Sequence, residues 1–130
     1  MRADRRRTLG AAGEDAVERW YRLAGHAVMA RNWRCAEGEI DLITRAPDGT
    51  LVFCEVKTRS GAAFGSPFEA VTVAKQRRLR RLAVRWLAER RSGAAAAVHV
   101  GRTAEVRFDV AGVLVGRGGE LTIEVLESAF

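Results

Sequence analysis

The chain has 130 residues and a mass of 14.3 kDa, with 48% hydrophobic and 29% charged residues, a composition typical of one compact domain. This composition excludes fibrous and largely disordered proteins, and the apolar runs are too short for a membrane span, which needs roughly 18 residues. The net charge of +6 favours a polyanionic partner, since residues 1–91 hold 19 of the 22 basic but only 11 of the 16 acidic residues.

The beginning of the chain is basic but lacks the apolar stretch of a secretory signal, so we expect a cytoplasmic protein. Cys35 and Cys54 form no CxxC pair, which predicts two reduced thiols rather than a disulfide framework or a zinc site. Among the basic residues, only Lys57 and Lys75 are lysines. Either chance or a need for an amine explains why these two positions are lysine in an arginine-rich chain.

Residues 1–7 are predicted to form a flexible basic arm, and residues 8–130 a single domain. Thr8 is a suitable N-cap for a helix that ends at Gly25. Glu14 lies at the edge of the apolar face and has no basic residue four positions later, which predicts an unpaired carboxylate near the core. That apolar face is predicted to contain Leu9, Ala12, Ala16, Trp20 and Leu23.

A strand is predicted over residues 27–34, followed by two strands that form a hairpin. The turn Ala46-Pro47-Asp48-Gly49 is typical of a three-residue hairpin loop and therefore sets the register. Because side chains alternate along a strand, four charged residues are predicted on one face of the hairpin. In this register Asp41 lies opposite Glu55, and Glu39 lies opposite Lys57.

A loop rich in Gly and Pro precedes a second predicted helix, from about Glu69 to Arg91. Lys75 and Gln76 fall on its buried side, near the start of the helix. The buried side continues with Leu79, Leu82, Ala83, Trp86 and Leu87, and the opposite arc carries Arg77, Arg78, Arg80, Arg81, Arg85 and Arg91. The last part of the chain predicts a closing β-hairpin.

Two carboxylates opposed across a hairpin have Cβ atoms about 5 Å apart, and they repel each other unless a cation lies between them. Ligands that are all oxygen suit Mg²⁺ or Mn²⁺ better than zinc. The acidic pair Asp41 and Glu55 therefore predicts a divalent metal site. The alternative is a solvated polar face on an edge hairpin.

The spacing of Asp41 with Glu55-Val56-Lys57, between an acidic helix and a Lys/Gln helix, resembles the PD-(D/E)XK nuclease superfamily. Ile40 stands where the signature of that superfamily has Pro. More closely, an ordered set of motifs from about Gly10 to Asp109 resembles the bacterial YraN-like family. The motifs are Gly13-Glu14, RNWR, GEIDLI, LVFCEVKTR, FGSP, Lys75 with RRLRRLA and WL, and RFDV.

The resemblance implies a restriction-endonuclease-like α/β core, a mixed β-sheet flanked by helices, and the order α-β-β-β-α-β-β read from the sequence is compatible with it. It also implies that Asp41 and Glu55 bind Mg²⁺ or Mn²⁺, with Glu14 as an additional ligand or an acid that orients water. Lys57 would hold the attacking water or the scissile phosphate. Because the usual pKa of lysine is about 10.4, electrostatic stabilisation is favoured over general-base action.

Several residues keep two interpretations at this stage. Glu39 pairs with Lys57 or binds metal, and Asp109 belongs to the family-like RFDV motif or to a surface charge ladder. Lys75 and Gln76 contact phosphate or cap their helix, and the basic arc binds nucleic acid or is simply solvated. The predicted nucleic-acid contacts are Arg59, Lys75, Gln76, Arg77, Arg78, Arg81 and Arg85.

Together these features predict a metal-dependent endonuclease that cleaves DNA phosphodiesters, with branched or single-stranded DNA as the preferred substrate. A non-catalytic nucleic-acid-binding accessory module with the same fold is the main alternative, and a ribonuclease is the third hypothesis. A homodimer is expected only by analogy with resolvase-like relatives.

Overall fold

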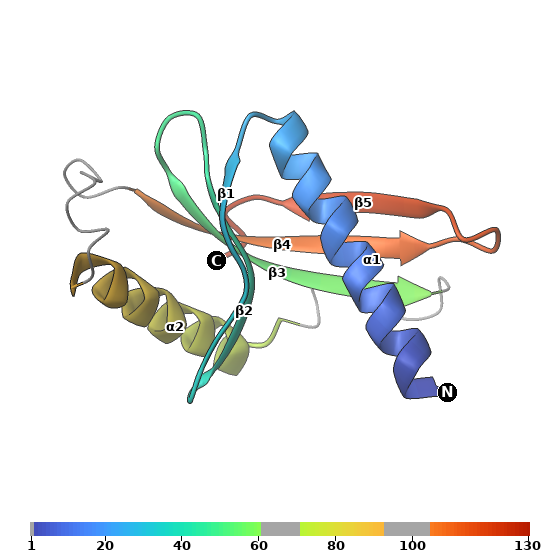
Figure 1. Ribbon diagram of the computed structural model, residues 1–130, viewed down its shortest axis with the longest axis horizontal. Helices are drawn as coiled ribbons and strands as arrows, with labels where there is room; N and C mark the ends of the chain where they lie inside the picture. Colours follow the sequence, from blue (N-terminus) through green and yellow to red (C-terminus); the bar gives the residue numbers. More distant parts are fainter. Residues whose placement is uncertain (1, 61–70, 93–104) are drawn as a thin grey trace.

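The computed structural model describes residues 2–60, 71–92 and 105–130. Within these ranges the helices and strands follow the predicted order α-β-β-β-α-β-β, which confirms the mixed α/β class (Figure 1). The helices are α1 (Arg2–Leu23) and α2 (Val73–Ser92), and the strands are β1 (Ala27–Cys35), β2 (Gly38–Arg45), β3 (Leu51–Ser60), β4 (Val106–Val115) and β5 (Leu121–Leu126). No helix in the described ranges is long and apolar enough to cross a membrane.

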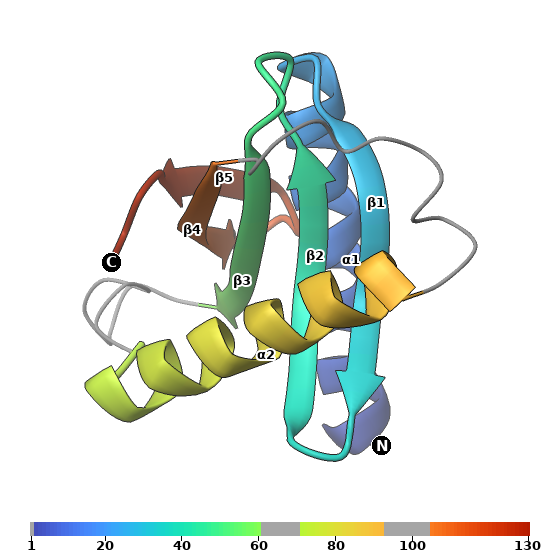
Figure 2. The ribbon, with the colours of Figure 1, turned by 90° about the vertical axis from the view of Figure 1, so that its left-hand side faces the viewer.

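The strands form one sheet in the order β1-β2-β3-β4-β5, in which β3 and β4 are parallel and the other neighbours are antiparallel. Figure 2 shows α2 crossing one face of the sheet and α1 lying on the opposite face. The predicted hairpin register is confirmed from the pair Leu42 and Cys54 to the pair Arg45 and Leu51. The sheet is thus the middle layer between the two helices.

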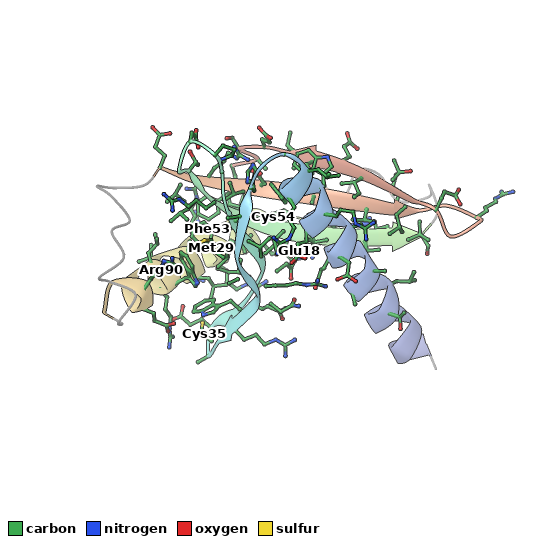
Figure 3. All side chains as sticks on the ribbon, turned by 45° about the horizontal axis from the view of Figure 1, so that its top comes forward. Glu18, Met29, Cys35, Phe53, Cys54 and Arg90 are labelled. Carbon is green, nitrogen blue, oxygen red and sulfur yellow. The ribbon has the colours of Figure 1, made fainter. Side chains whose placement is uncertain are left out.

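Adjacent residues of β3 belong to different cores because their side chains alternate across the sheet. Phe53 packs under α2 with Leu82 and Trp86, whereas Cys54 packs under α1 with Tyr21. In Figure 3, Met29 and Phe53 lie toward α2, and Cys54 lies toward α1. The α2 side also confirms the predicted apolar face of that helix, whose buried members are Leu79, Leu82, Ala83 and Trp86.

Two predictions for α1 are wrong. The helix begins at Arg2 instead of Thr8, so residues 2–7 continue the helix rather than precede it as an arm. The buried face is also rotated from the predicted one, since Val17 and Tyr21 are fully buried while Leu23 is 84% exposed. Gly13 lies against β3 on this buried face, where a side chain would run into Thr58 Oγ1.

Asp109 is fully buried on β4, so its assignment to a surface charge ladder is wrong. The Tyr21 hydroxyl donates a hydrogen bond to Asp109 Oδ2 at 2.6 Å, and the Arg107 guanidinium donates to both carboxylate oxygens at 2.9 and 3.0 Å. The Ser128 N–H donates to Oδ1 at 3.1 Å. This buried carboxylate therefore links α1, β4 and the C-terminal residues.

Helix α2 begins at Val73, later than the predicted start at Glu69, which lies outside the described residues. Thr72 serves as the N-cap, since its Oγ1 accepts a hydrogen bond from the Lys75 N–H at 3.2 Å. The Gln76 side-chain amide donates to the Val71 carbonyl at 3.2 Å. These contacts hold the start of α2 to the two residues that precede it.

Candidate active site

The candidate site lies where β2 and β3 separate. Their ladder ends at the pair Leu42 and Cys54; beyond it β2 continues beside β1, and β3 beside β4. The Asp41 side chain lies at this branch, where its Oδ2 accepts a hydrogen bond from the Val56 N–H at 2.8 Å. The Asp41 carboxylate thus accepts the hydrogen bond that a backbone carbonyl of β2 would accept if the ladder continued.

A pocket of about 260 Å³ opens beside this branch. It brings Asp41 and Glu55 together, as the hairpin register predicted, and Glu55 Oε1 lies 3.0 Å from Lys57 Nζ. Lys75 and Arg78 reach the same pocket from the first turns of α2. The pocket therefore joins carboxylates of β2 and β3 with cationic groups of α2.

Burial is the main reason that the pKa of Asp41 rises to about 7 from its usual 3.8. The negative charge of Glu55 is the next cause, and the more remote charges of Glu14 and Glu39 act in the same direction. The hydrogen bond from the Val56 N–H opposes them by stabilising the ionised form. Without a cation, the site thus favours a protonated Asp41 up to about neutral pH.

Glu39 lines the pocket, but its predicted pairing with Lys57 is wrong. Its Oε2 lies 3.2 Å from Nε of Arg34 on the adjacent strand β1, while Lys57 pairs with Glu55. The difference arises because β2 and β3 have already separated at this level, so Glu39 no longer faces Lys57 across a ladder.

Glu14 has a partner, contrary to the prediction that it is unpaired. Arg31 on β1 places Nη2 at 3.5 Å from Glu14 Oε2, and its other nitrogen pairs with Asp15. Arg31 also donates to the Ala11 carbonyl at 3.2 Å, so it fastens α1 to the edge strand. Sequence reasoning missed Arg31 because its partners lie on another element, and no periodicity connects the two.

Glu14, Asp41 and Glu55 do not form a closed ligand cluster. Among the described residues, no group of three or more His, Cys, Asp or Glu side chains is placed to hold a metal ion. Asp41 and Glu55 share the pocket with Glu39, which pairs with Arg34, whereas Glu14 lines a different cavity. The arrangement thus offers two acidic ligands and a third, arginine-paired acid at one pocket, with Glu14 at the border of the other cavity.

The arginines on α2 have different roles. Arg80 lies over the ring of Phe108 at 5.0 Å, and Arg85 pairs with Glu37 and with Glu89. Within the described ranges, three exposed arginines of the first turns make no ion pair, and one of them lines the acidic pocket. These are Arg77, Arg78 and Arg81. This basic surface, defined by the three arginines, leads along α2 away from the carboxylates.

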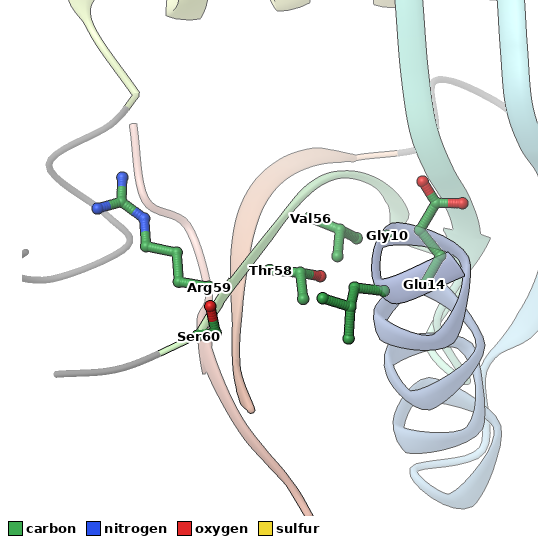
Figure 4. A pocket seen from close by; sticks show the side chains of 7 residues that line it. Gly10, Glu14, Val56, Thr58, Arg59 and Ser60 are labelled. Carbon is green, nitrogen blue, oxygen red and sulfur yellow. The ribbon is translucent and has the colours of Figure 1, made fainter. Parts of the chain in front are cut away.

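A larger cavity of about 440 Å³ lies between α1 and β3 (Figure 4). Val56, Thr58 and Leu9 form its walls together with Gly10, and Glu14 stands at its border. Arg59, a predicted nucleic-acid contact, also borders the cavity, but its side chain extends away from α1 in Figure 4. Strand β3 contributes to both sites, since Val56 and Thr58 line this cavity and Glu55 lines the acidic pocket.

The profile described as "Uncharacterised protein family UPF0102" matches residues 13–113. A UPF0102 protein of Parafrankia sp. (strain EAN1pec) is 48% identical over the full length of both chains. Another from Beutenbergia cavernae is 52% identical, covering 91% of this chain and 92% of its own. These matches confirm the expected resemblance at the level of the family.

A structure of SfsA from Pyrococcus furiosus in complex with Ca²⁺ is similar to this chain, with a TM-score of 0.35 and 14% sequence identity. The similarity covers 91% of this chain but only 62% of SfsA, so the chain spans less than two thirds of that protein.

Proposed function

This chain belongs to the UPF0102 family, and we propose that it hydrolyses phosphodiester bonds in DNA with the help of Mg²⁺ or Mn²⁺. The observation that carries the proposal is the half-buried carboxylate pair of Asp41 and Glu55, whose pocket also holds Lys75 and Arg78. The proposal includes membership of the PD-(D/E)XK superfamily, supported by the order of the elements and by the spacing of Asp41, Glu55 and Lys57.

The donor set fits a hard divalent cation. Asp41 and Glu55 supply only oxygen ligands, and Mg²⁺ commonly binds through one or two carboxylates while waters and substrate phosphate complete its shell. A cation between the two carboxylates would also offset the repulsion that raises the pKa of Asp41. When bound, such an ion lowers the pKa of water and stabilises negative charge on the phosphate.

The protein's own residues have separate tasks in this proposal. Lys57, held 3.0 Å from Glu55, keeps a compact positive charge beside the carboxylates and would contact the attacking water or the scissile phosphate. Lys75 and Arg78 would bind phosphate oxygens from the α2 side of the pocket. Glu14 would act as an additional ligand or orient water after exchanging its partner Arg31.

DNA is the proposed partner because Arg77, Arg78 and Arg81 extend the positive charge beyond the pocket. The chain carries no helix-turn-helix or zinc-finger motif, so we propose recognition of a branched or single-stranded shape rather than of a base sequence. Such an enzyme would act in the cytoplasm. A homodimer stays a prediction by analogy.

A second function is favoured by a specific observation. Glu14 is engaged by Arg31, and no three acidic side chains of the described residues converge on one point. A non-catalytic accessory module that binds nucleic acid through the same basic surface would need no such convergence. The two functions differ in what happens to the DNA after it is bound.

The test is cleavage of labelled duplex, single-stranded, flap and four-way-junction DNAs, and of RNA, with Mg²⁺, with Mn²⁺ and with a chelator. Asp41→Asn, Glu55→Gln and Lys57→Ala proteins are assayed beside the wild type. The proposal expects metal-dependent cutting that all three substitutions abolish while binding persists. Cutting of RNA alone would identify a ribonuclease, and binding to the panel without cutting would favour the accessory module.

A further inference from the structure

We infer that the cavity between α1 and β3 binds an unpaired nucleobase next to the phosphate held at the acidic pocket. This inference deepens the proposed function and rests on it for the position of the phosphate. Its substrate class is DNA that contains an unpaired nucleotide. The occupant is any one of the four planar bases, surrounded by apolar side chains and hydroxyl groups.

The cavity and the acidic pocket adjoin at Val56. The Val56 N–H binds Asp41 of the acidic pocket, while the Val56 side chain lines the cavity on the α1 side. Glu14 borders the cavity and also acts electrostatically on Asp41. The two sites are therefore close at Val56 and Glu14, and we place the base of a nucleotide whose phosphate lies at the carboxylates in this cavity.

The lining has the chemistry of a base site rather than of a phosphate site. Leu9 and Val56 offer apolar surface, and Thr58 and Ser60 add hydroxyl groups (Figure 4). The Glu14 carboxylate borders the cavity, and Arg59, the cationic residue of its lining, points away from α1. A phosphate would therefore be repelled there.

Size and access limit the occupant further. At about 440 Å³ the cavity falls within the roughly 300–1,000 Å³ typical of small-ligand pockets. It lies between a helix and a strand, so a base that enters it cannot stay paired with a second strand. Proteins that accept such extruded bases hold them by apolar packing and by hydrogen bonds to the base edge.

Gly10 allows the cavity to be filled without disturbing the helix. A Cβ atom placed on Gly10 meets nothing within 4 Å, so Gly10→Leu puts a side chain into open space and improves helix propensity. Ala11→Leu is the matched control, since it adds the same side chain at the next, exposed position of α1. Thermal unfolding of both variants checks that each is folded.

Fluorescence anisotropy in the presence of a chelator measures binding of a labelled single strand and of a blunt duplex. We expect Gly10→Leu to weaken single-strand binding by about tenfold and to leave duplex binding unchanged. Only the single strand has unpaired bases that can enter the cavity. Ala11→Leu should bind both DNAs as the wild type does. Equal single-strand affinity of the wild type and Gly10→Leu overturns the inference, as does an absence of single-strand binding.

A second measurement changes the DNA and uses the same two proteins, wild type and Gly10→Leu. Single strands that carry one abasic position at a time should lose affinity for the wild type at one position and show no such loss with Gly10→Leu. A uniform response across positions overturns the inference. Cleavage is scored separately: if no DNA is cut but Gly10→Leu still loses single-strand binding, the proposed nuclease function fails while the base site stands.

Discussion

Asp41 is ionised in the unfolded chain at a much lower pH than in the folded protein. Burial and the charge of Glu55 raise its pKa from 3.8 to about 7. Between these values the folded state retains a proton that the unfolded state has lost, so the stability of the metal-free protein falls as pH rises. The contribution of Asp41 is fully present below about pH 4 and is lost by about pH 7.

The substitution Asp41→Asn should therefore stabilise the metal-free protein at pH 8. Asparagine keeps an oxygen that accepts the hydrogen bond from the Val56 N–H but removes the half-buried charge. We expect an increase of about 1–3 kcal/mol in the free energy of unfolding at pH 8, shrinking toward pH 4. Urea unfolding with a chelator at both pH values measures it, and a difference independent of pH would contradict the assignment of the raised pKa.

The two lysines of the chain both lie at this site. Lys57 contacts Glu55, and Lys75 lines the same pocket from α2. An ammonium group is a compact point charge, whereas the guanidinium of arginine is a wide planar fork. Their placement favours the interpretation that an amine is needed at both positions, in a chain whose other basic residues are arginines.

The approach of α1 to the sheet depends on Gly13. Gly13→Ala should destabilise the protein by about 1–3 kcal/mol, because the added methyl meets Thr58 Oγ1 and forces the helix away from β3. Gly10→Ala in the same helix should stabilise it by up to about 1 kcal/mol, because its surroundings are open and alanine has the better helix propensity. Thermal unfolding of the pair measures both signs.

Thr58→Ala should partly rescue Gly13→Ala, since it removes the hydroxyl that the methyl meets. Equal stability of the two glycine variants would show that the helix adapts without cost. The same helix carries Glu14 in the next position, so a displaced α1 would also move this acid relative to Arg31.

The local part of the site could be predicted from the sequence. The turn at Ala46-Pro47-Asp48-Gly49 fixes which residues face each other, and the structure keeps this register up to the pair Leu42 and Cys54. The point at which β2 and β3 separate could not be predicted, because β3 turns to pair with β4 from a distant part of the chain. For this reason the hairpin register predicts Lys57 as the partner of Glu39, whereas the structure pairs Glu39 with Arg34.

Helix α1 illustrates a second limit. Arginine is a good helix former, and no Gly or Pro interrupts residues 2–7, so the helix extends beyond the expected cap at Thr8. The apolar stripe around Leu23 suggested a buried face, but tertiary contacts decide the rotation of the helix. Tyr21 turns inward because its hydroxyl binds the buried Asp109, a partner 88 residues away in sequence.

At the scale of the whole molecule, Asp109 joins three separate segments. Asp109→Asn should cost about 3–5 kcal/mol, because the Arg107 guanidinium would lose its buried counter-charge. Tyr21→Phe removes a single hydrogen bond and should cost about 1–3 kcal/mol. Urea unfolding compares them with Glu124→Gln, an exposed acid on β5; equal stability of all three variants would contradict a structural role for Asp109.

The basic surface should make DNA binding depend strongly on salt. If about six cationic side chains contact phosphates, the logarithm of the affinity falls with the logarithm of salt concentration at a slope near −5. Each of Arg77→Gln, Arg78→Gln and Arg81→Gln should reduce the slope by about 1. Arg117→Gln, in the turn between β4 and β5, is the control, and a slope near zero would contradict DNA binding by this surface.

The parallel pairing of β3 with β4 divides the assembly of the sheet into a fast and a slow part. Strands β1 to β3 follow one another directly and close through short turns, whereas Leu51 must find Val106 after the whole of α2 has intervened. Contacts between distant residues carry a larger loop-closure entropy and form later. We therefore expect the segment from Asp41 to Lys57 to form early, as part of the hairpin, and the docking of β4 beside it to limit the folding rate.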